Sequence, residues 1–281
     1  MLNIKLHITL LRRYLAYYLR AKTRYDVHPP FLFQLTEEVL EDERFYYAFQ
    51  DIALLRAQLQ QNHRWLELTD HGAGSLINGS KRRTIADLAR NSAISRESGE
   101  LLFRLVRFMQ PKQMLEMGAS LGISAAYQAA AAPRGATFIT LEGCPQTAEE
   151  ARSNLQQLAP GKIEVRTGPF EVSLPLALKD LGRLDYLYLD GDHREGASLS
   201  YFNTCLPYAH DGSVFVIADI HWSAQMERAW EQLKQHPEVT LSVDLFHFGL
   251  LFFRKAQLAP QSVSLIKARY KPWRAGFFSA G

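Results

Sequence analysis

The stretch from Lys112 to Tyr127, KQMLEMGASLGISAAY, constrains the fold more than any other part of the chain. A short apolar run leads to two glycines, Gly118 and Gly122, and then to an alanine-rich segment with the composition of a helix. This order predicts a strand, a tight turn and a helix, because glycine permits sharp turns and the close approach of a ligand. The start of the helix offers free N–H groups and the positive end of a dipole. The pattern therefore favours a nucleotide-like ligand at the turn.

A second candidate ligand contact is Glu142, which ends the β-rich run 136–141. In Rossmann-like folds an acidic residue at the tip of the second strand, about 20 residues after the glycine turn, binds ribose hydroxyls. A solvated carboxylate favoured by the dipole of the following helix is the alternative. We expect Glu142 to bind a ribose.

Strands and helices alternate from Gln113 onward, and two further strands follow after residue 238 with no helix between them. Alternation of this kind predicts an α/β, Rossmann-like fold, with helices on both faces of a seven-stranded, mostly parallel sheet. Ligands of such sheets bind beyond the carboxyl ends of the strands. The predicted strands cover 114–117, 138–141, 163–166, 184–189, 214–218, 239–245 and 250–253.

Polar residues follow the fourth and fifth of these strands. The segment LDYLYLDGDH ends in Asp190, Asp192 and His193, and VFVIADIHW carries Asp219 and His221. The carboxyl ends of parallel strands meet at one edge, so these side chains are expected near the ligand. An imidazole titrates near neutral pH and is suited to accept a proton, which makes His193 the preferred base. A surface or helix-capping role is the alternative for each histidine, and the stronger one for His221.

The glycine spacing, Glu116-x-Gly118-x-x-x-Gly122, lacks the G-x-G-x-x-G pattern of dinucleotide folds, because its second glycine would fall on Ser120. An acidic residue two positions before the first glycine, with another glycine four positions later, resembles the first motif of class I S-adenosylmethionine (SAM) dependent methyltransferases. The antiparallel pair of strands that closes the sheet also resembles that family.

The segment Asp190-Gly191-x-His193 is similar to a motif of small-molecule O-methyltransferases within the class. The resemblance covers residues 113–255 and implies SAM-dependent methylation of an oxygen on a small-molecule acceptor. It implies His193 and Asp190 as catalytic residues. The cofactor-binding residues that it implies are Glu116, Gly118, Ala119, Ser120, Gly122, Glu142, Gly143 and Asp190.

Metal-assisted relatives hold Mg²⁺ between carboxylates at the two strand ends, which here implies Asp190 and Asp219. The residues beside Asp219 are Ala218 and Ile220, where relatives often have a further carboxylate or an asparagine. Two carboxylates are a small set for an ion that prefers six oxygens, although water and acceptor oxygens can complete it.

The chain divides by composition into a helical N-terminal extension with a connector (1–83), the SAM-binding domain (84–256) and a basic C-terminal tail (257–281). We expect the extension to cap the active site and to help form a homodimer; packing in the core, or lying on a membrane, are the alternatives. Its first helix is predicted from an apolar stripe at helical spacing, formed by Ile4, Ile8, Leu11, Leu15 and Tyr18.

The connector, 70–83, is rich in glycine and ends in Lys81, Arg82 and Arg83, which either bind an anionic group of the acceptor or belong to a solvated linker. Each end of the chain carries six Lys and Arg residues without an acid, within 1–25 and 245–281. We expect these charges to pair with the acidic middle of the protein, rather than with a membrane or an anionic substrate.

Apolar runs are too short to span a membrane and no secretory leader is visible, so a cytoplasmic protein is expected. Cys144 and Cys205 are too few for a disulfide framework. A SAM- or nucleotide-binding interaction protein without turnover is the main alternative. A nucleic-acid methyltransferase, suggested by the pI of about 8.8, is disfavoured because no N-P-P-Y motif is present. The glycine spacing disfavours an NAD-dependent enzyme, and no nucleic-acid partner is expected.

Overall fold

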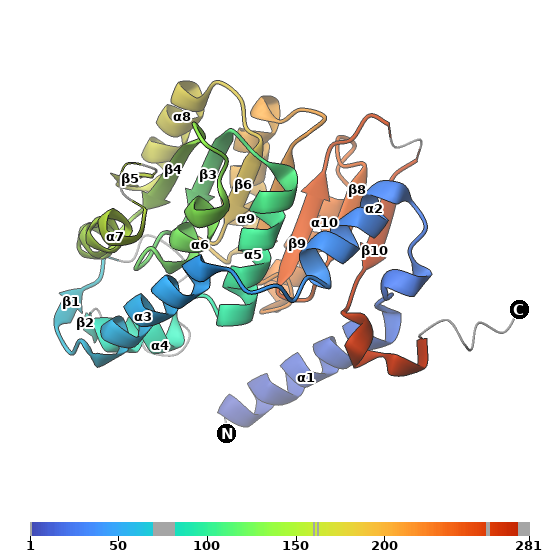
Figure 1. The fold of residues 1–281 in the computed structure, drawn as a ribbon, viewed down its shortest axis with the longest axis horizontal. Helices are drawn as coiled ribbons and strands as arrows, with labels where there is room; N and C mark the ends of the chain where they lie inside the picture. The colour runs from blue at the N-terminus through green and yellow to red at the C-terminus, as the bar shows by residue number, and fades with distance from the viewer. Residues whose placement is uncertain (1, 70–81, 160, 162, 257–258, 275–281) are drawn as a thin grey trace, which may run out of the picture.

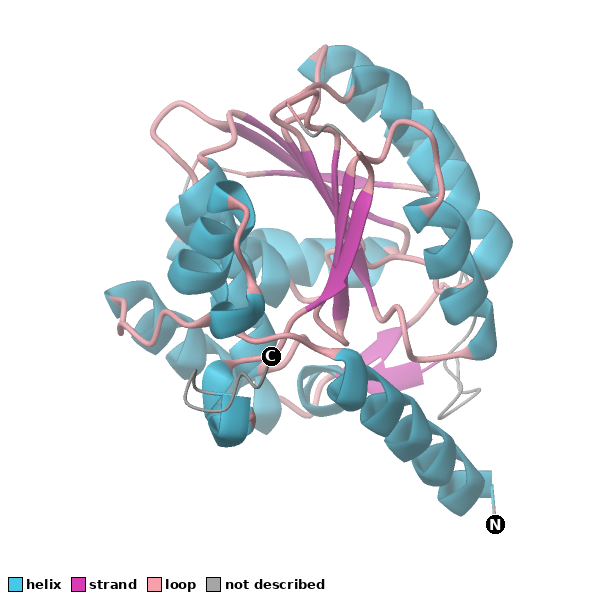
Figure 2. Cartoon of the chain, turned by 90° about the vertical axis from the view of Figure 1, so that its right-hand side faces the viewer, coloured by secondary structure: helices cyan, strands magenta, loops and turns pink. Residues whose placement is uncertain are grey.

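The computed structural model describes residues 2–69, 82–159, 161, 163–256 and 259–274, with side chains from residue 7 onward. Its centre is an eight-stranded sheet in the order β10-β8-β9-β7-β6-β3-β4-β5, with helices on both faces (Figures 1 and 2). Within this sheet β9 alone runs antiparallel to its neighbours, β7 and β8. The strands are β3 (Gln113–Met117), β4 (Thr137–Glu142), β5 (Glu164–Thr167), β6 (Tyr186–Leu189), β7 (Val214–Ala218), β8 (Leu241–Asp244), β9 (Phe248–Phe252) and β10 (Gln261–Ser264).

The predicted α/β, Rossmann-like class is confirmed, with one strand more than predicted. The additional strand, β10, lies in the segment assigned to the basic tail and pairs in parallel with β8. Its sequence, QSVS, is short and polar at three of its four positions, so it gives little strand signal; only Val263 is buried.

Ten α-helices are found among the described residues, together with short 3₁₀ turns at 24–26, 206–208, 268–270 and 272–274. A small antiparallel pair, β1 (Trp65–Glu67) and β2 (Arg82–Thr84), brackets the connector and was not predicted; residues 70–81, including Lys81, lie outside the described residues. The helices are α1 (Leu2–Arg20), α2 (Pro30–Leu35, continuing as a π-helical turn at Thr36–Leu40), α3 (Tyr47–Gln61), α4 (Ile85–Asn91), α5 (Arg96–Met109), α6 (Ile123–Ala131), α7 (Pro145–Leu158), α8 (Phe170–Leu181), α9 (Glu195–Cys205) and α10 (Ala224–Lys234).

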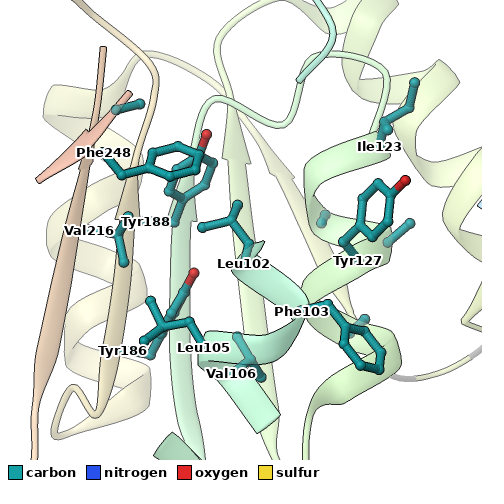
Figure 3. Close-up of a cluster of buried hydrophobic side chains, with 14 of the residues drawn as sticks. Leu102, Phe103, Leu105, Val106, Ile123, Tyr127, Tyr186, Tyr188, Val216 and Phe248 are labelled. Atoms are coloured by element: carbon teal, nitrogen blue, oxygen red, sulfur yellow. The ribbon is translucent and has the colours of Figure 1, made fainter. Parts of the chain in front are cut away.

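Alternation along β6 shows how the sheet separates two cores. Tyr186 and Tyr188 point toward Leu102 and Leu105 of α5 (Figure 3). Leu187 and Leu189 of the same strand pack on the opposite face, with side chains of α8, α9 and α10. Successive side chains of a strand point to opposite faces, and a strand buried on both reads as a continuous apolar run.

Part of the predicted N-terminal extension packs into the core of the sheet. Phe49 and Ile52 of α3, and Leu32 of α2, are buried in the same core as Tyr186 and Tyr188. The crossover helices of the sheet cover only part of this face. On this face the crossover helices α6 and α7 lie toward β3, β4 and β5, and α2 and α5 cover the part around β9 (Figure 1).

The aromatic contact of Phe31 with Phe252 of β9, with ring centroids 5.2 Å apart, belongs to this covering layer. The aromatic residues of 27–66 divide between core and surface: Phe49 is buried and Phe31 and Tyr46 pack against the core, whereas the others are exposed, namely Phe33, Phe45, Tyr47 and Trp65.

Helix α1 projects from the body, with its N-terminal end farthest out (Figures 1 and 2). Its predicted apolar stripe is not buried within the chain: Ile8, Leu11 and Leu15 are 52%, 57% and 49% exposed. Tyr17 is the buried residue, and its hydroxyl donates to the backbone oxygen of Leu265. Ile4 falls among residues whose side chains are not described.

Basic residues at both ends pair with acids elsewhere in the chain, as expected. Arg13 contacts Glu227 at 2.8 Å and Arg274 contacts Asp26 at 3.2 Å; Arg24 with Glu37 and Arg269 with Glu43 add to the set. In the described part of the chain, none of the helices has the length and apolar character needed to cross a bilayer.

Candidate active site

The turn after β3 fits closely against the end of β6. Gly118 has φ +101°, and a Cβ on it would lie 2.7 Å from the backbone oxygen of Asp190. Its N–H donates to the backbone oxygen of Leu141, at 2.8 Å, which binds the turn to β4 as well. Only glycine satisfies both the left-handed backbone and this close approach. The turn therefore lies where β3, β4 and β6 end.

Glu142 connects the turns that follow β3 and β4. Its Oε2 accepts a hydrogen bond from the backbone N–H of Ser120 at 2.7 Å, and its Oε1 accepts one from Cys144 at 2.9 Å. The residue is only half-buried, as is Gly143 beside it. Each carboxylate oxygen has two lone pairs, so Glu142 keeps acceptor capacity for ligand hydroxyls.

Glu116 was predicted among the cofactor-binding residues, and its position corrects that prediction. It has no exposed surface, and its carboxylate accepts hydrogen bonds from Ser124 (2.6 Å), Thr140 (2.6 Å) and Gln128 (2.9 Å). Burial raises the pKa of Glu116 to about 7, although these hydrogen bonds act to lower it. Glu116 therefore holds β3, β4 and α6 together beneath the turn, and it does not reach a ligand.

Two more predicted residues shape the turn from within. Ala119 is buried, and Gly122 caps the start of α6 with φ +80°. A Cβ on Gly122 would lie 3.1 Å from Leu155, so a larger residue would push α7 away. Ser120 and Gly118 keep some exposure and remain candidates for direct contact.

His193 lies between two carboxylates that come from different strands. Its Nε2 is 3.6 Å from Oδ1 of Asp190, at the end of β6, and 3.8 Å from Oδ2 of Asp219, at the end of β7. One nitrogen or oxygen from each side chain lies within 4.8 Å of the others, and all three residues are partly exposed. The three residues predicted for catalysis and metal binding therefore form one accessible cluster.

Asp190 has a perturbed environment. Burial raises the pKa of Asp190 to about 7; proximity of Asp219 adds to the rise, and His193 opposes it. The hydroxyl of Tyr188 donates to Oδ2 of Asp190 at 2.9 Å. The sequence analysis did not identify Tyr188, because an aromatic residue in an apolar strand is normally a core residue. Tyr188 and Asp190 are two positions apart, which places both side chains on one face of a strand, and this spacing was the signal that could have identified it.

Asp192 and His221 have structural partners instead. Asp192 is 2% exposed and forms an ion pair with Arg194 at 2.6 Å. His221 lies 3.0 Å from Asp244 and 3.3 Å from Glu227. Burial lowers the pKa of His221, but hydrogen bonding to these carboxylates outweighs it and the net pKa is raised. His221 is thus a buried residue held by two carboxylates, which is neither the surface nor the helix-capping role expected as its alternative.

Part of this chain is similar in sequence to known methyltransferases. Residues 115–220 match the family model described as a methyltransferase domain. A catechol O-methyltransferase of Niastella koreensis is 26% identical over 170 residues, which are 57% of this chain and 75% of that protein. A catechol O-methyltransferase of Mycobacterium tuberculosis is 30% identical over 129 residues, 46% of this chain and 57% of that protein.

Solved structures share the fold. An O-methyltransferase from Bacillus cereus in complex with SAH aligns with a TM-score of 0.52 at 17% identity, over 76% of this chain and 93% of that one. The SAH-bound methyltransferase of Podospora anserina also gives 0.52 at 17% identity, over 59% of this chain and 81% of that one.

The fold and these matches define a class I SAM-dependent methyltransferase. Within that class, the chain is similar to small-molecule O-methyltransferases, since both relatives above are named catechol O-methyltransferases.

Proposed function

We propose that this enzyme methylates a hydroxyl of a small phenol at the edge where β3, β4, β6 and β7 end, and that His193 accepts the hydroxyl proton. The observation that carries the proposal is the cluster itself: one imidazole with its Nε2 3.6 Å and 3.8 Å from two carboxylates, beside the Gly118 turn. The curated relatives are named catechol O-methyltransferases, so catechol is the natural first acceptor to test.

The residues at the turn fit SAM. Glu142, half-buried with acceptor capacity left, suits the ribose hydroxyls, and Gly118, Ser120 and Gly143 offer backbone next to it. Asp190 and Asp219 bring negative charge to the same edge, with His193 as the basic group between them. SAM supplies a methyl group on a positively charged sulfur, which this charge attracts.

Proton removal is the step assigned to this chain's own side chains. A phenol has a pKa near 10, so it reacts faster when a base takes its proton as the new bond forms. The acceptor oxygen bonds to the methyl carbon while the S–CH₃ bond breaks, and the proton moves to Nε2 of His193. Asp190 and Asp219 then stabilise the imidazolium, since both face that nitrogen.

The Mg²⁺ expected between Asp190 and Asp219 fits this donor set poorly. The third group within reach is the imidazole of His193, and Ile220 beside Asp219 is buried and apolar. Mg²⁺ prefers six oxygens in an octahedron, and an imidazole nitrogen suits transition metals better. We therefore derive no step through a metal, and expect turnover to survive a chelator such as EDTA; loss of activity that Mg²⁺ restores would contradict this.

The direct test of the proposed reaction uses SAM labelled with ¹³C at the methyl carbon and catechol as acceptor. We expect a methyl ether of catechol, identified by mass spectrometry and by the ¹³C shift of an O-methyl group. A protein that binds SAM tightly but yields no methylated product from catechol would instead support the interaction-protein alternative.

Assembly and location are further parts of the proposal. We propose a homodimer, with the exposed apolar residues Ile8, Leu11 and Leu15 of α1 in its interface, and a cytoplasmic protein. Light scattering after gel filtration tests the first: a monomer at micromolar concentration would contradict it. Cell fractionation tests the second, with the protein expected in the cytosolic fraction.

A further inference from the structure

Tyr188 has a buried hydroxyl that binds one of the two carboxylates beside His193. The residue is 1% exposed, and its hydroxyl donates to Oδ2 of Asp190 at 2.9 Å. Tyr188 lies in β6 and Asp190 follows that strand two positions later, so both side chains point to the same face of the sheet. The hydroxyl therefore lies behind the reacting groups, enclosed by protein.

Asp190 divides its two oxygens between Tyr188 and His193. Oδ2 accepts the hydrogen bond from Tyr188, and Oδ1 is the oxygen 3.6 Å from Nε2 of His193. The backbone of Asp190 is fixed as well, because its N–H donates to the oxygen of Met117 in β3 at 2.9 Å. Rotation of the side chain is the freedom that remains, and a hydrogen bond to one carboxylate oxygen fixes where the other oxygen points.

A second carboxylate lies beside Tyr188, but it is already occupied. Glu116 of β3 is the register partner of Tyr188 in the sheet. A buried hydroxyl without a partner is costly, so Tyr188 keeps its bond to Asp190. The carboxylate of Glu116 accepts its hydrogen bonds from Ser124, Gln128 and Thr140.

The ring of Tyr188 is held by the core, so it does not follow the carboxylate. It packs edge to face on Phe248 of β9, with ring centroids 5.9 Å apart, in the same core as Leu102 of α5 (Figure 3). Close packing keeps a large side chain in one rotamer. The hydroxyl is thus a fixed point to which Asp190 is bound.

Asp219, the other carboxylate beside His193, has no comparable support. Within the described part of the chain, no group donates a hydrogen bond to its carboxylate. Asp219 lines a cavity of about 280 Å³ between α1 and the loops that follow β7 and β8, and its side chain is 42% exposed, against 27% for Asp190. Of the two carboxylates, Asp190 is therefore the one whose direction is set by the fold.

We propose that Tyr188 is a positioning residue for methyl transfer: it keeps Oδ1 of Asp190 turned toward His193, which holds the imidazole in place for the acceptor hydroxyl. Because Tyr188 is enclosed, it acts through Asp190 and not on a ligand. Such a residue raises the rate of the chemical step without adding to binding, since small misplacements of a reacting group are costly. This inference rests on the proposed function, because it concerns the base of that reaction.

Two variants of β6 separate the hydrogen bond from general packing. Tyr188→Phe removes the one oxygen that binds Asp190. Tyr186→Phe removes the same atom from an equally buried side chain on the same face, whose hydroxyl has no hydrogen-bond partner among the described residues. The measurements are kcat and KM with SAM and 4-methylcatechol, a catechol with one apolar substituent, and the affinity for SAM by calorimetry.

We expect Tyr188→Phe to lower kcat at least about ten-fold, with the KM for 4-methylcatechol and the affinity for SAM within about two-fold of wild type. Tyr186→Phe should keep all three values within about two-fold of wild type. Equal kcat in both variants would overturn the inference. So would a loss of SAM affinity as large as the loss of kcat in Tyr188→Phe, since it would show a general structural role.

Replacement of Tyr188 by 4-aminophenylalanine keeps a hydrogen-bond donor at the same place. We expect this variant to recover kcat to within about three-fold of wild type. A kcat as low as that of Tyr188→Phe would contradict the hydrogen bond as the cause.

Crystal structures of the complexes with SAH separate this inference from the proposed reaction. We expect Oδ1 of Asp190 to face Nε2 of His193 in Tyr186→Phe and to turn away from it in Tyr188→Phe. If wild type forms no methyl ether, the reaction proposal fails, and this difference still shows whether Tyr188 positions Asp190. The same orientation of Asp190 in both variants would overturn the inference, whether or not a methyl ether forms.

Discussion

Three acidic residues near one edge of the sheet differ in what they can do because they differ in burial. Glu116 is enclosed and bonded to three side chains; Glu142 is half-buried and bonded to two backbone N–H groups; Asp190 is partly open and faces His193. A carboxylate with no exposure contributes to folding, and only the other two can meet a ligand. Sequence spacing alone does not separate these cases.

Glu142→Ala is expected to lower the affinity for SAM about ten-fold or more, since hydrogen bonds to a charged group contribute about 1.5–3 kcal/mol. Isothermal titration measures the affinity, and thermal unfolding checks that the turns stay ordered. Glu149→Ala, an exposed acid on α7, is the matched control. Unchanged SAM affinity in Glu142→Ala would remove the ribose assignment, and tighter binding of NAD than SAM would contradict the cofactor.

Glu116→Gln tests the buried carboxylate through stability. The folded pKa of Glu116 is about 7, against about 4.3 in an unfolded chain, so the native state keeps a proton that the unfolded state has lost. The free energy of unfolding should therefore fall as pH rises across that window, by up to about 1.4 kcal/mol per pH unit, and level off above it.

Glutamine cannot ionise, so Glu116→Gln should remove this part of the slope in urea titrations between pH 5 and 8. The raised pKa of Asp190 adds a slope of the same sign, which the variant leaves in place. Identical pH dependence in wild type and Glu116→Gln would show that Glu116 is ionised in the fold throughout.

At the scale of elements, the strands were the easiest part to predict. β6 and β7 are buried on both faces, so they read as continuous apolar runs followed by an aspartate, and β3 is marked by the glycine turn that follows it. β10 and the β1–β2 pair are short and partly exposed, and their pairing depends on neighbours far away in the sequence. Nothing in their own residues could have revealed them.

Helix α1 shows the opposite failure. Its periodicity predicted the helix correctly, but the stripe is exposed and the attachment to the body depends on Arg13 and Tyr17, on other faces. Periodicity identifies an apolar face without saying what covers it. Of the N-terminal helices that were expected to cap the active site, α1 is the one whose residues line the cavity beside Asp219.

Removal of residues 1–20 is expected to leave a folded protein that binds SAM normally and its acceptor poorly. Apart from Tyr17 and Tyr18, the described side chains of α1 are not part of a buried cluster, whereas Leu10, Leu11 and Tyr14 line the cavity. Circular dichroism and calorimetry check the two parts. Wild-type affinity for 4-methylcatechol in this truncated protein would contradict the role given to α1.

On the scale of the whole molecule, the boundary predicted at residue 83 does not separate two cores. Leu32, Phe49 and Ile52 share a core with the face of the sheet that carries Tyr186 and Tyr188. The sequence pattern changes near residue 83 from helices alone to alternating strands and helices. Only the packing shows that α2 and α3 complete a layer that α6 and α7 leave open. The division into domains at that point thus remains a sequence-based prediction that the packing does not favour.

Deletion of residues 1–65 is accordingly expected to abolish cooperative unfolding, because it removes several side chains that are at most 5% exposed from the main core. Each loss of a buried Leu, Ile or Phe costs about 2–5 kcal/mol, so three together cost about as much as the whole stability of an ordinary domain. A soluble fragment 66–281 with a sharp thermal transition and intact SAM binding would support the prediction that the N-terminal extension is a separate domain.

The most direct test of the whole account is the rate of a single turnover with SAM and 4-methylcatechol bound, in wild type, His193→Ala and the control His63→Ala, an exposed residue after α3. Loss of a general base should slow O-methyl formation about 100-fold or more in His193→Ala, with SAM affinity retained and His63→Ala at the wild-type rate. A methyl ether formed equally fast in all three proteins would contradict the assignment of His193, and SAM bound without any methyl ether in wild type would contradict the proposed reaction.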